Sequence, residues 1–234
     1  MRASTLSETG SVRQKNEDAL YSSPEHGFFA VADGMGGHDS GEIASSIAIE
    51  IIRIELEDLQ ELSPGRIVAA FVAANKAIYE KSATKGKQSS MGTTLSVFKV
   101  LKDRGYVGHI GDSRIYLIRN QEIIRLTEDH TYVERLYQDG IISYDEYLHH
   151  PKRNILLKAL GGDRPPEPQV LEFQLLPGDQ IFMCTDGVHN YLNHDEIISI
   201  LLQKKGKPML KAFKEAIETR GSGDNYSIIA IDRI

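Results

Sequence analysis

Acidic residues stand at the ends of apolar, strand-like runs at widely separated places in this chain. Such runs lead directly into Asp33 and Asp186, and another run begins just after Asp224. Burying an unpaired carboxylate is costly, so these side chains need a common partner. Several carboxylates in one place require a cation, and oxygen ligands select hard ions such as Mg²⁺ or Mn²⁺. The chain must therefore fold so that these strand ends meet around metal ions.

The longest acidic motif is Asp33-Gly34-Met35-Gly36-Gly37-His38. An Asp-Gly pair alone is a common turn dipeptide, so neither this pair nor Asp186-Gly187 would identify a site by itself. The glycines of the longer motif let the backbone approach an ion or phosphate closely and leave the Gly34 carbonyl available as a ligand. Together with Asn16-Glu17-Asp18 and Gly223-Asp224-Asn225, these motifs indicate a two-metal hydrolase.

The composition limits the partners of the protein. The net charge is −6, whereas a nucleic-acid partner held by its phosphates needs a basic surface. The single cysteine excludes an intrachain disulfide and suits a reducing cytoplasm. No segment approaches the roughly 18 apolar residues of a membrane span, and the first residues lack the apolar core of a signal peptide. We therefore expect a cytoplasmic protein with no nucleic-acid or membrane partner.

Short strand-like runs and pairs of helical patterns make up most of the chain. The predicted strands are 28–32, 94–100, 104–110, 114–118, 170–175, 180–184 and 227–231. Short turns between neighbouring runs favour antiparallel hairpins. Apolar steps of three or four predict helices over 42–59, 67–78, 195–203 and 208–219, the first with Ile43, Ile47, Ile51 and Ile54 on one face. The pattern predicts an α+β domain of packed sheets covered by helices, spanning residues 1–234.

A polar, tyrosine-rich stretch at residues 128–153 differs from the rest of the chain. A helix is predicted over 131–139, and Gly140 ends it. A polar insert with short helices inside a strand-rich chain is typical of a surface flap. No heptad repeat or long apolar edge indicates an obligate oligomer, so we expect a monomer.

The motifs and their order resemble the bacterial metal-dependent Ser/Thr protein phosphatases of the type 2C (PPM) family. The resemblance covers essentially the whole chain, and the matching stretches are residues 9–13, 16–18, 31–42, 91–94, 108–114, 126–130, 185–187 and 223–225. It implies a central sandwich of two antiparallel β-sheets flanked by antiparallel helix pairs. The family places its metal ions in a cleft at one edge of that sandwich.

The resemblance implies a set of metal ligands. Asp33 would bridge two Mg²⁺ or Mn²⁺ ions, and Gly34 would offer its carbonyl to one of them. Asp186 and Asp224 would complete the other site. Asp18 would lie outside the direct ligands and hold water on the metals, helped by the neighbouring Glu17.

Other residues would act on the substrate or on a weaker metal. Arg13 matches the arginine that grips the substrate phosphate, and Asp112 matches the residue that, with Asp186, binds a third and weaker metal ion. His38 is either a general acid or substrate contact, or a residue of the local turn. Eukaryotic relatives place a histidine where this chain has Met35, so the acid role does not transfer directly to His38.

The chemistry explains these residue types. Two cations lower the pKa of bound water, so a metal-bridging hydroxide can attack phosphorus in line with the leaving serine or threonine oxygen. Phosphoryl transfer needs charge neutralisation, which two divalent ions and the planar fork of Arg13 supply. We expect hydrolysis of phosphoserine and phosphothreonine in proteins, opposing a bacterial Ser/Thr kinase.

Several other functions would also involve phosphate chemistry or phosphoproteins. One is a catalytically idle module of the same fold that binds phosphoproteins, and another is a phosphohydrolase for small molecules. A cysteine phosphatase needs an arginine six residues after its nucleophile, but Asn190 stands six residues after Cys184. Dinuclear phosphatases with histidine ligands need Gly-Asp-x-His, and the sequence Gly-Asp-Ser-Arg around Asp112 lacks the histidine.

Overall fold

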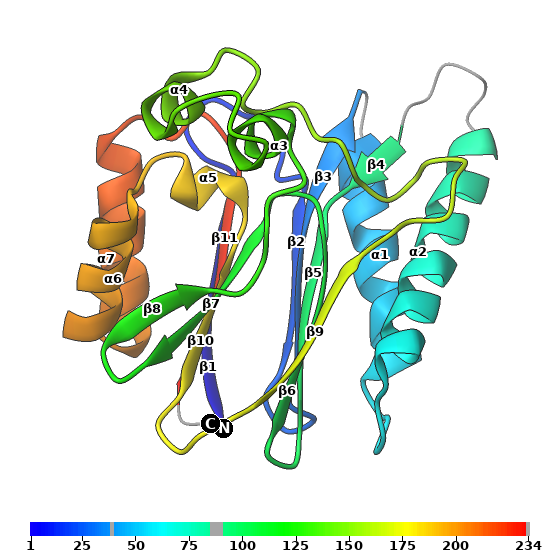
Figure 1. Cartoon of the computed structure of the whole chain (residues 1–234), viewed down its shortest axis with the longest axis horizontal. Coiled ribbons are helices and arrows are strands. Elements are labelled where there is room, and N and C mark those ends of the chain that lie inside the picture. Colours follow the sequence, from blue (N-terminus) through cyan, green and yellow to red (C-terminus); the bar gives the residue numbers. More distant parts are fainter. Residues whose placement is uncertain (38–39, 85–90, 233–234) are drawn as a thin grey trace.

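The computed structural model describes residues 1–37, 40–84 and 91–232 and has two antiparallel sheets face to face, with a helix pair on each outer side (Figure 1). The strands are β1 (Arg2–Glu8), β2 (Asp18–Ser23), β3 (Phe28–Gly36), β4 (Met91–Thr93), β5 (Leu95–Leu101), β6 (Arg104–Ile110), β7 (Arg114–Arg119), β8 (Glu122–Arg125), β9 (Gln169–Gln174), β10 (Gln180–Cys184) and β11 (Tyr226–Asp232). The helices are α1 (Ser40–Leu56), α2 (Pro64–Thr84), α3 (Tyr132–Gln138), α4 (Tyr144–His149), α5 (Asp186–His189), α6 (His194–Gln203) and α7 (Gly206–Thr219). The predicted α+β sandwich is confirmed.

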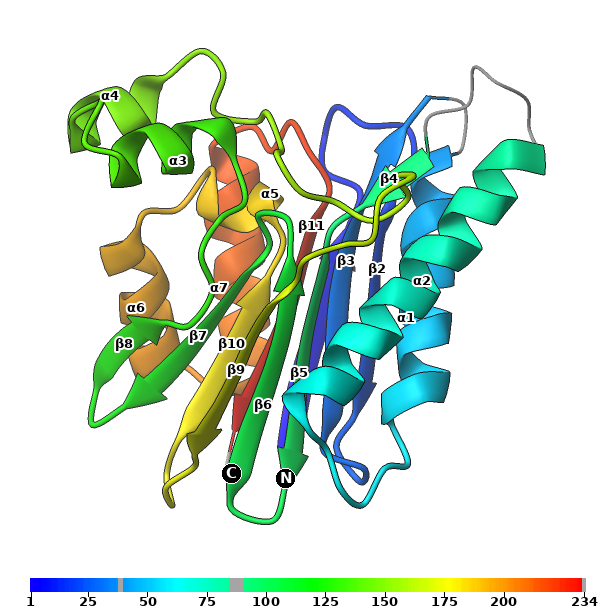
Figure 2. The ribbon, with the colours of Figure 1, turned by 45° about the vertical axis from the view of Figure 1, so that its right-hand side comes forward.

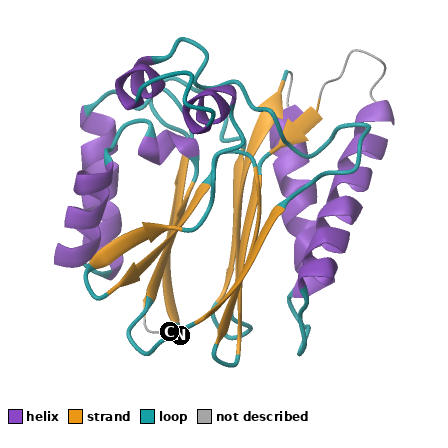
Figure 3. Cartoon of the chain, viewed as in Figure 1, coloured by secondary structure: helices purple, strands orange, loops and turns teal. Residues whose placement is uncertain are grey.

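The strand order explains how distant motifs meet. One sheet runs β1-β11-β10-β7-β8 and the other β2-β3-β5-β6-β9, with β4 paired to β3. Helices α6 and α7 cover the first sheet, and α1 and α2 cover the second (Figure 2). The short helices α3, α4 and α5 lie at one end of the sandwich, and the N-terminus and the last residues of β11 lie at the other end (Figure 3).

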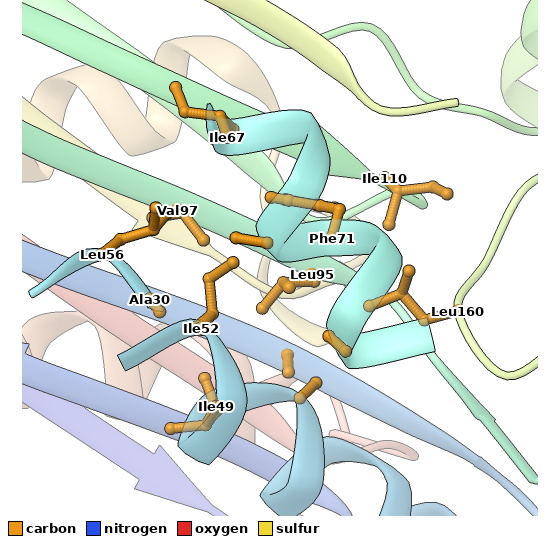
Figure 4. Packing of buried hydrophobic residues seen from close by; sticks show 14 of the residues in the cluster. Ala30, Ile49, Ile52, Leu56, Ile67, Phe71, Leu95, Val97, Ile110 and Leu160 are labelled. Atoms are coloured by element: carbon orange, nitrogen blue, oxygen red, sulfur yellow. The ribbon is translucent and has the colours of Figure 1, made fainter. Parts of the chain in front are cut away.

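Helix α1 was predicted correctly as an element, but its buried face was wrong. The isoleucines at 43, 47 and 51 are only partly buried, and Ile54 is 62% exposed. The fully buried stripe lies one position further along and contains Ala44, Ala48 and Ile52. Small alanine side chains let the helix approach the sheet closely, and larger residues such as Ile52 then pack against Ala30 and Val97 (Figure 4). Shape, rather than hydrophobicity alone, selected the buried face.

Strands β1, β2, β4 and β8 are additions to the predicted set. Strand β1 has a polar sequence with an alternating exposure pattern, and it forms the edge of its sheet beside β11. An edge strand is held by backbone pairing on one side and needs no continuous apolar run. Its register pairs Ser7 with Ser227, which places the N-terminal segment beside the motif that contains Asp224. None of the described helices is both long and apolar enough to cross a bilayer.

Candidate metal centre

The inner faces of three strands end in polar residues at one end of the sandwich. Side chains alternate between the two faces of a strand, and Phe29 and Val31 of β3 point into the core between the sheets. Asp33 continues that inward set at the next step of two. By the same count Thr185 follows Ile181 and Met183 of β10, and Ser227 precedes Ile229 of β11. The site is therefore the polar end of the core between the two sheets.

Asp18 lies opposite Asp33 in the register of β2 and β3 and is held from the other sheet. Its Oδ2 accepts hydrogen bonds from Thr185 Oγ1 at 2.9 Å and from Ser227 Oγ at 2.7 Å. Its Oδ1 is buried and has no hydrogen-bond partner among the described residues. Such an oxygen is costly unless an ion or water meets it. Sequence reasoning gave Thr185 and Ser227 no role, although both are hydroxyl residues next to metal-motif residues.

Asp186 begins α5, directly after β10. Its Oδ2 accepts from Asn190 Nδ2 at 3.0 Å, and its Oδ1 is a second buried carboxylate oxygen without a partner in the described structure. Burial raises the pKa of Asp186, and repulsion by Asp224 raises it further. Asn190, one turn along the helix from Asp186, is a site residue that the sequence reasoning missed.

The aspartates raise one another's pKa values. Burial first, and then repulsion by Asp186 and Asp18, hold the pKa of Asp33 well above its ordinary range. For Asp18 burial again comes first, and Asp186 and Asp224 add to it. Like charges at such sites disfavour each other's ionised form. The fold therefore brings these four predicted residues, Asp18, Asp33, Asp186 and Asp224, into one electrostatic cluster.

Asp224 is engaged by Arg13 rather than pointing freely into the cluster. Arg13 Nε lies 2.9 Å from Asp224 Oδ1, and Arg13 Nη2 donates to Asp224 Oδ2 at 3.0 Å. No three Asp, Glu, His or Cys side chains of the described residues already form a complete ligand set. The strand register still pairs Asp18 with Asp33, and Thr185, the residue before Asp186, donates to Asp18, so these carboxylates share one end of the sandwich.

Gly34 lies where the backbone of β3 passes very close to the start of α1. A Cβ on Gly34 would be 2.1 Å from the carbonyl oxygen of Gly41 and 2.6 Å from that of Glu17, so only glycine fits. Gly34 N donates to Glu17 O at 3.2 Å, and Ser45 Oγ donates to the same oxygen at 2.6 Å. This crossing fixes the loop of Glu17 and Asp18 against α1 and β3.

Asn225 ties the segment that carries Arg13 to the metal centre. Its Nδ2 donates to the carbonyls of Thr9 and Lys15 at 2.8 and 2.9 Å, and its Oδ1 accepts from the backbone N–H of Glu17 at 2.9 Å. The side chain is buried, and its three hydrogen bonds close the loop on both sides of Arg13. Sequence reasoning placed Asn225 in a motif but did not assign it this role.

We expect Asn225→Asp to destabilise the protein by roughly 2–4 kcal/mol, because a carboxylate cannot donate to the two carbonyls and leaves them unpaired. Urea unfolding with and without Mn²⁺ would measure the change. Asn120→Asp, which adds the same charge at an exposed turn, is the matched control. An unchanged urea midpoint for Asn225→Asp would mean that the three bonds do not hold the loop.

Asp112 lies in a tight turn between β6 and β7, close to α5. Its backbone carbonyl accepts from His189 Nε2 at 2.9 Å, so α5 and this turn are joined directly. Burial, followed by repulsion from Asp186 and Asp129, raises the pKa of the Asp112 carboxyl. Asp112 is therefore joined to α5, the helix that Asp186 begins, and its role as a ligand stays a prediction.

Two buried histidines and the single cysteine have structural roles, and one candidate residue is not described by the structure. Burial lowers the pKa of His109 and of His189 to about 3, so both rings are neutral at neutral pH and serve as hydrogen-bond partners. Burial raises the pKa of Cys184 to about 12, as fits a core thiol. His38, the candidate general acid, lies outside the described residues.

The residue set fits a hard divalent cation. The donors are carboxylate oxygens, and two of them are buried without a protein partner in the described chain. Mg²⁺ and Mn²⁺ prefer oxygen ligands of this kind and offset several neighbouring negative charges. Asp33, Asp186 and Asp224 are the residues that would hold such ions directly, and Asp18 would hold water on the ions.

Comparisons with known proteins point to one family. The protein phosphatase 2C family profile matches residues 10–221. The serine/threonine protein phosphatase PstP of Mycobacterium tuberculosis is 32% identical over 99% of this chain, which spans 45% of that protein. Its crystal structure superposes with a TM-score of 0.92, covering 99% of this chain and 97% of the crystallised one.

Two further proteins extend the comparison. The serine/threonine phosphatase stp of Listeria welshimeri is 29% identical over 100% of this chain and 96% of its own length. The catalytic domain of a PstP phosphatase in complex with two manganese ions is 30% identical, with a TM-score of 0.89 over 100% of this chain and 98% of that one. The similarity therefore covers both the fold and nearly all of the sequence.

Proposed function

The chain belongs to the protein phosphatase 2C family, and we propose that it is a Mg²⁺- or Mn²⁺-dependent enzyme that hydrolyses phosphoserine and phosphothreonine in proteins. One observation carries the proposal above all. Asp18, Asp33 and Asp186 lie together at the polar end of the core between the sheets, and two of their oxygens are buried without partners in the described structure. An idle binding module would have no reason to keep so costly a set of carboxylates.

We assign two tightly bound ions and a third, weaker one to this cluster. Asp33, Asp186, Asp224 and the carbonyl of Gly34 would hold the two tight ions. Asp112, beside Asp186, would hold the third ion. When bound, such ions supply a nucleophilic hydroxide at neutral pH and neutralise charge on the phosphoryl group.

The protein's own residues then position the reactants. Asp18, fixed by Thr185 and Ser227, presents its second oxygen toward the cluster and orients water there. Arg13 is about half exposed; its Nε and Nη2 pair with Asp224, and the guanidinium has a second planar fork, Nη1 with Nη2, that matches two phosphate oxygens. Since Arg13 already pairs with Asp224, it stands at the mouth of the same cluster and holds the phosphate beside the metal ligands.

Phosphate release from a phosphothreonine peptide, with Mn²⁺, with Mg²⁺ and with a chelator, tests the proposed function. We expect hydrolysis that needs the metal and exceeds that of free nucleotides and sugar phosphates in kcat/KM. Preference for the small molecules would support the phosphohydrolase alternative instead. Peptide binding without any phosphate release would support the idle binding module.

The biological setting is part of the proposal. Phosphoprotein substrates follow from the Ser/Thr phosphatases that this chain resembles, and a bacterial Ser/Thr kinase whose phosphorylation the enzyme reverses would supply them. The cytoplasmic location, the monomeric state, the absence of a nucleic-acid or membrane partner and the single catalytic domain over residues 1–234 stay predictions from the sequence.

We expect Arg13→Ala to lower kcat/KM on a phosphopeptide by about one to two decades, the equivalent of roughly 1.5–3 kcal/mol for a charge-assisted hydrogen bond. Mn²⁺ affinity should not fall, because the substitution frees both oxygens of Asp224. Steady-state kinetics and calorimetry would measure the two effects. Arg13→Lys keeps the positive charge but lacks the planar fork, so its kcat/KM should lie between those of the wild type and Arg13→Ala. A collapse of Mn²⁺ affinity in Arg13→Ala would make Arg13 a structural residue.

A further inference from the structure

A pocket of about 340 Å³ lies beside the metal centre, between the flap helices α3 and α4 and the helices α5 and α6. Asp112, His189 and Asn190 are among the residues that line it. Asn190 is also the residue that donates to Asp186 at 3.0 Å. The pocket volume is within the range of about 300–1,000 Å³ that is common for binding sites. The pocket therefore shares Asn190 with the immediate surroundings of Asp186.

Three tyrosines of the flap form the outer wall of this pocket. The ring centroids of Tyr137 and Tyr147 are 5.5 Å apart, those of Tyr137 and Tyr144 are 5.9 Å apart, and those of Tyr144 and Tyr147 are 6.0 Å apart. Tyr137 is 41% exposed and Tyr144 is 59% exposed, and Leu148 beside them is 44% exposed. A gathering of exposed large apolar residues on one small element marks an interaction surface.

The charged groups around the pocket cancel one another. Three arginines and three carboxylates line it: Arg114, Arg125, Arg153, Asp112, Asp129 and Glu134. Arg114 pairs with Asp129 at 2.6 Å, and Arg125 pairs with Glu134 at 3.3 Å, so four of the six are already engaged. Such a lining gives no net attraction to a strongly acidic or basic ligand. The balanced charge favours an uncharged ligand, and Tyr137, Tyr144 and Leu148 supply exposed apolar surface for it.

The polar pairs also hold Tyr147, against which Tyr137 and Tyr144 pack. Tyr147 OH donates to Glu134 Oε2 at 3.1 Å, and Asp129, at the base of the flap, is buried and gripped by Arg114 through both oxygens. An aromatic wall that is fixed before binding loses little conformational entropy when a ligand arrives. This arrangement suits specific binding of one ligand side chain rather than non-specific apolar contact.

We propose that this pocket binds a large apolar side chain, aromatic or branched aliphatic, of the phosphoprotein substrate. The inference rests on the proposed phosphatase function and adds to it a rule of substrate selection. An extended chain advances only about 3.3–3.6 Å per residue. The selected side chain therefore belongs to a residue within a few positions of the phosphoserine or phosphothreonine. Tyr137 and Tyr144 are the specificity-determining residues.

A set of phosphothreonine peptides, each with one phenylalanine placed in an otherwise alanine and glycine background, tests the proposal with the metal-loaded enzyme. We expect kcat/KM to rise about tenfold for phenylalanine at one favoured position, the discrimination that a modest apolar pocket provides. Tyr137→Ala and Tyr144→Ala should each reduce that preference to about twofold or less. Hydrolysis of nitrophenyl phosphate, which is too short to reach the pocket, should be unchanged.

Tyr79→Ala is the matched control, because Tyr79 is 47% exposed on α2, away from the flap. It should retain the full preference. Equal kcat/KM for every peptide in the wild-type protein, or a preference that survives both flap substitutions, would overturn the pocket assignment while leaving the phosphatase function intact. Hydrolysis of nitrophenyl phosphate without hydrolysis of any peptide would instead overturn the proposed function, and the pocket assignment with it.

Discussion

Asp33→Asn is expected to abolish turnover and, at the same time, to stabilise the metal-free protein. Burial and the repulsion of Asp186, Asp18, Asp112 and Asp224 raise the pKa of Asp33, so the folded protein disfavours its charged form. Asparagine has nearly the same shape and no charge, so the metal-free fold no longer bears that repulsion. The same change removes the ligand that would bridge two cations, and the loss of turnover should exceed the 10–100-fold cost of removing an outer-sphere partner.

The thermal midpoint of each protein, recorded with a chelator and with Mn²⁺, measures both effects. We expect Asp33→Asn to melt above the wild type in the chelator and below it in saturating Mn²⁺, because only the wild type gains the binding free energy of the ions. Asp186→Asn should behave in the same way, since burial and Asp224 raise its pKa too. Wild-type turnover in either variant would contradict the two-metal assignment.

Asp179→Asn is the matched control for this experiment. Asp179 is also buried, but Arg119 holds it through both oxygens at 2.9 and 2.6 Å, and Leu176 N donates to it. Its pKa is lowered by these partners, against the effect of burial. The same chemical change should therefore destabilise the fold by about 1–3 kcal/mol with or without Mn²⁺. Stabilisation of the metal-free protein by Asp33→Asn and destabilisation by Asp179→Asn would show that Asp33 is repelled by its neighbours, whereas Asp179 is held by them.

The sequence predicted those parts of the fold that depend on apolar runs and on local spacing. Strands β3, β10 and β11 appeared at their expected positions because the first two contain apolar runs that lead into Asp33 and Asp186, and the third contains one that begins just after Asp224. The polar edge strand β1 was missed because its stability comes from pairing with β11, which lies more than 200 residues away in the sequence. The buried face of α1 was wrong because close packing selects alanine over isoleucine there. Local periodicity reports neither the long-range pairing of β1 nor the close packing of α1.

The candidate site divides in a similar way. The carboxylates could be found because charged residues at strand ends are unusual and demand an explanation. The residues that hold them, Thr185, Ser227, Asn190 and Asn225, are ordinary polar types whose role depends on contacts across the fold. Because alternate residues of a strand face the same side, counting every second residue would have placed Thr185 and Ser227 on the inward face with Asp33. The pairing of Arg13 with Asp224 follows only from the assembled structure.

Asp112→Ala should leave the two tight metal ions bound and still lower turnover sharply, by about 10–100-fold. Asp33, Asp186 and Asp224 remain to hold the tight ions, whereas the third site loses one of the few carboxylates near it. Excess Mn²⁺ should not restore turnover, because a hard cation needs several oxygen ligands at once. Calorimetric titration with Mn²⁺ and phosphopeptide turnover across a wide Mn²⁺ range would measure the two outcomes.

A structural role in the turn is the competing explanation for Asp112, and the contacts of the turn argue against it. Gly111 adopts a φ of 109°, its N–H donates to His130 Nδ1 at 3.1 Å, and Ser113 Oγ lies 2.9 Å from Thr94 Oγ1. The bond from His189 reaches the backbone carbonyl of Asp112, which alanine retains. The metal-free melting temperature of Asp112→Ala should therefore not fall, and Asp103→Ala, at an exposed hairpin turn, should change neither stability nor turnover. Normal peptide turnover in Asp112→Ala would remove the third ion from the proposed mechanism, because no other carboxylate of the described residues lies in that turn beside Asp186.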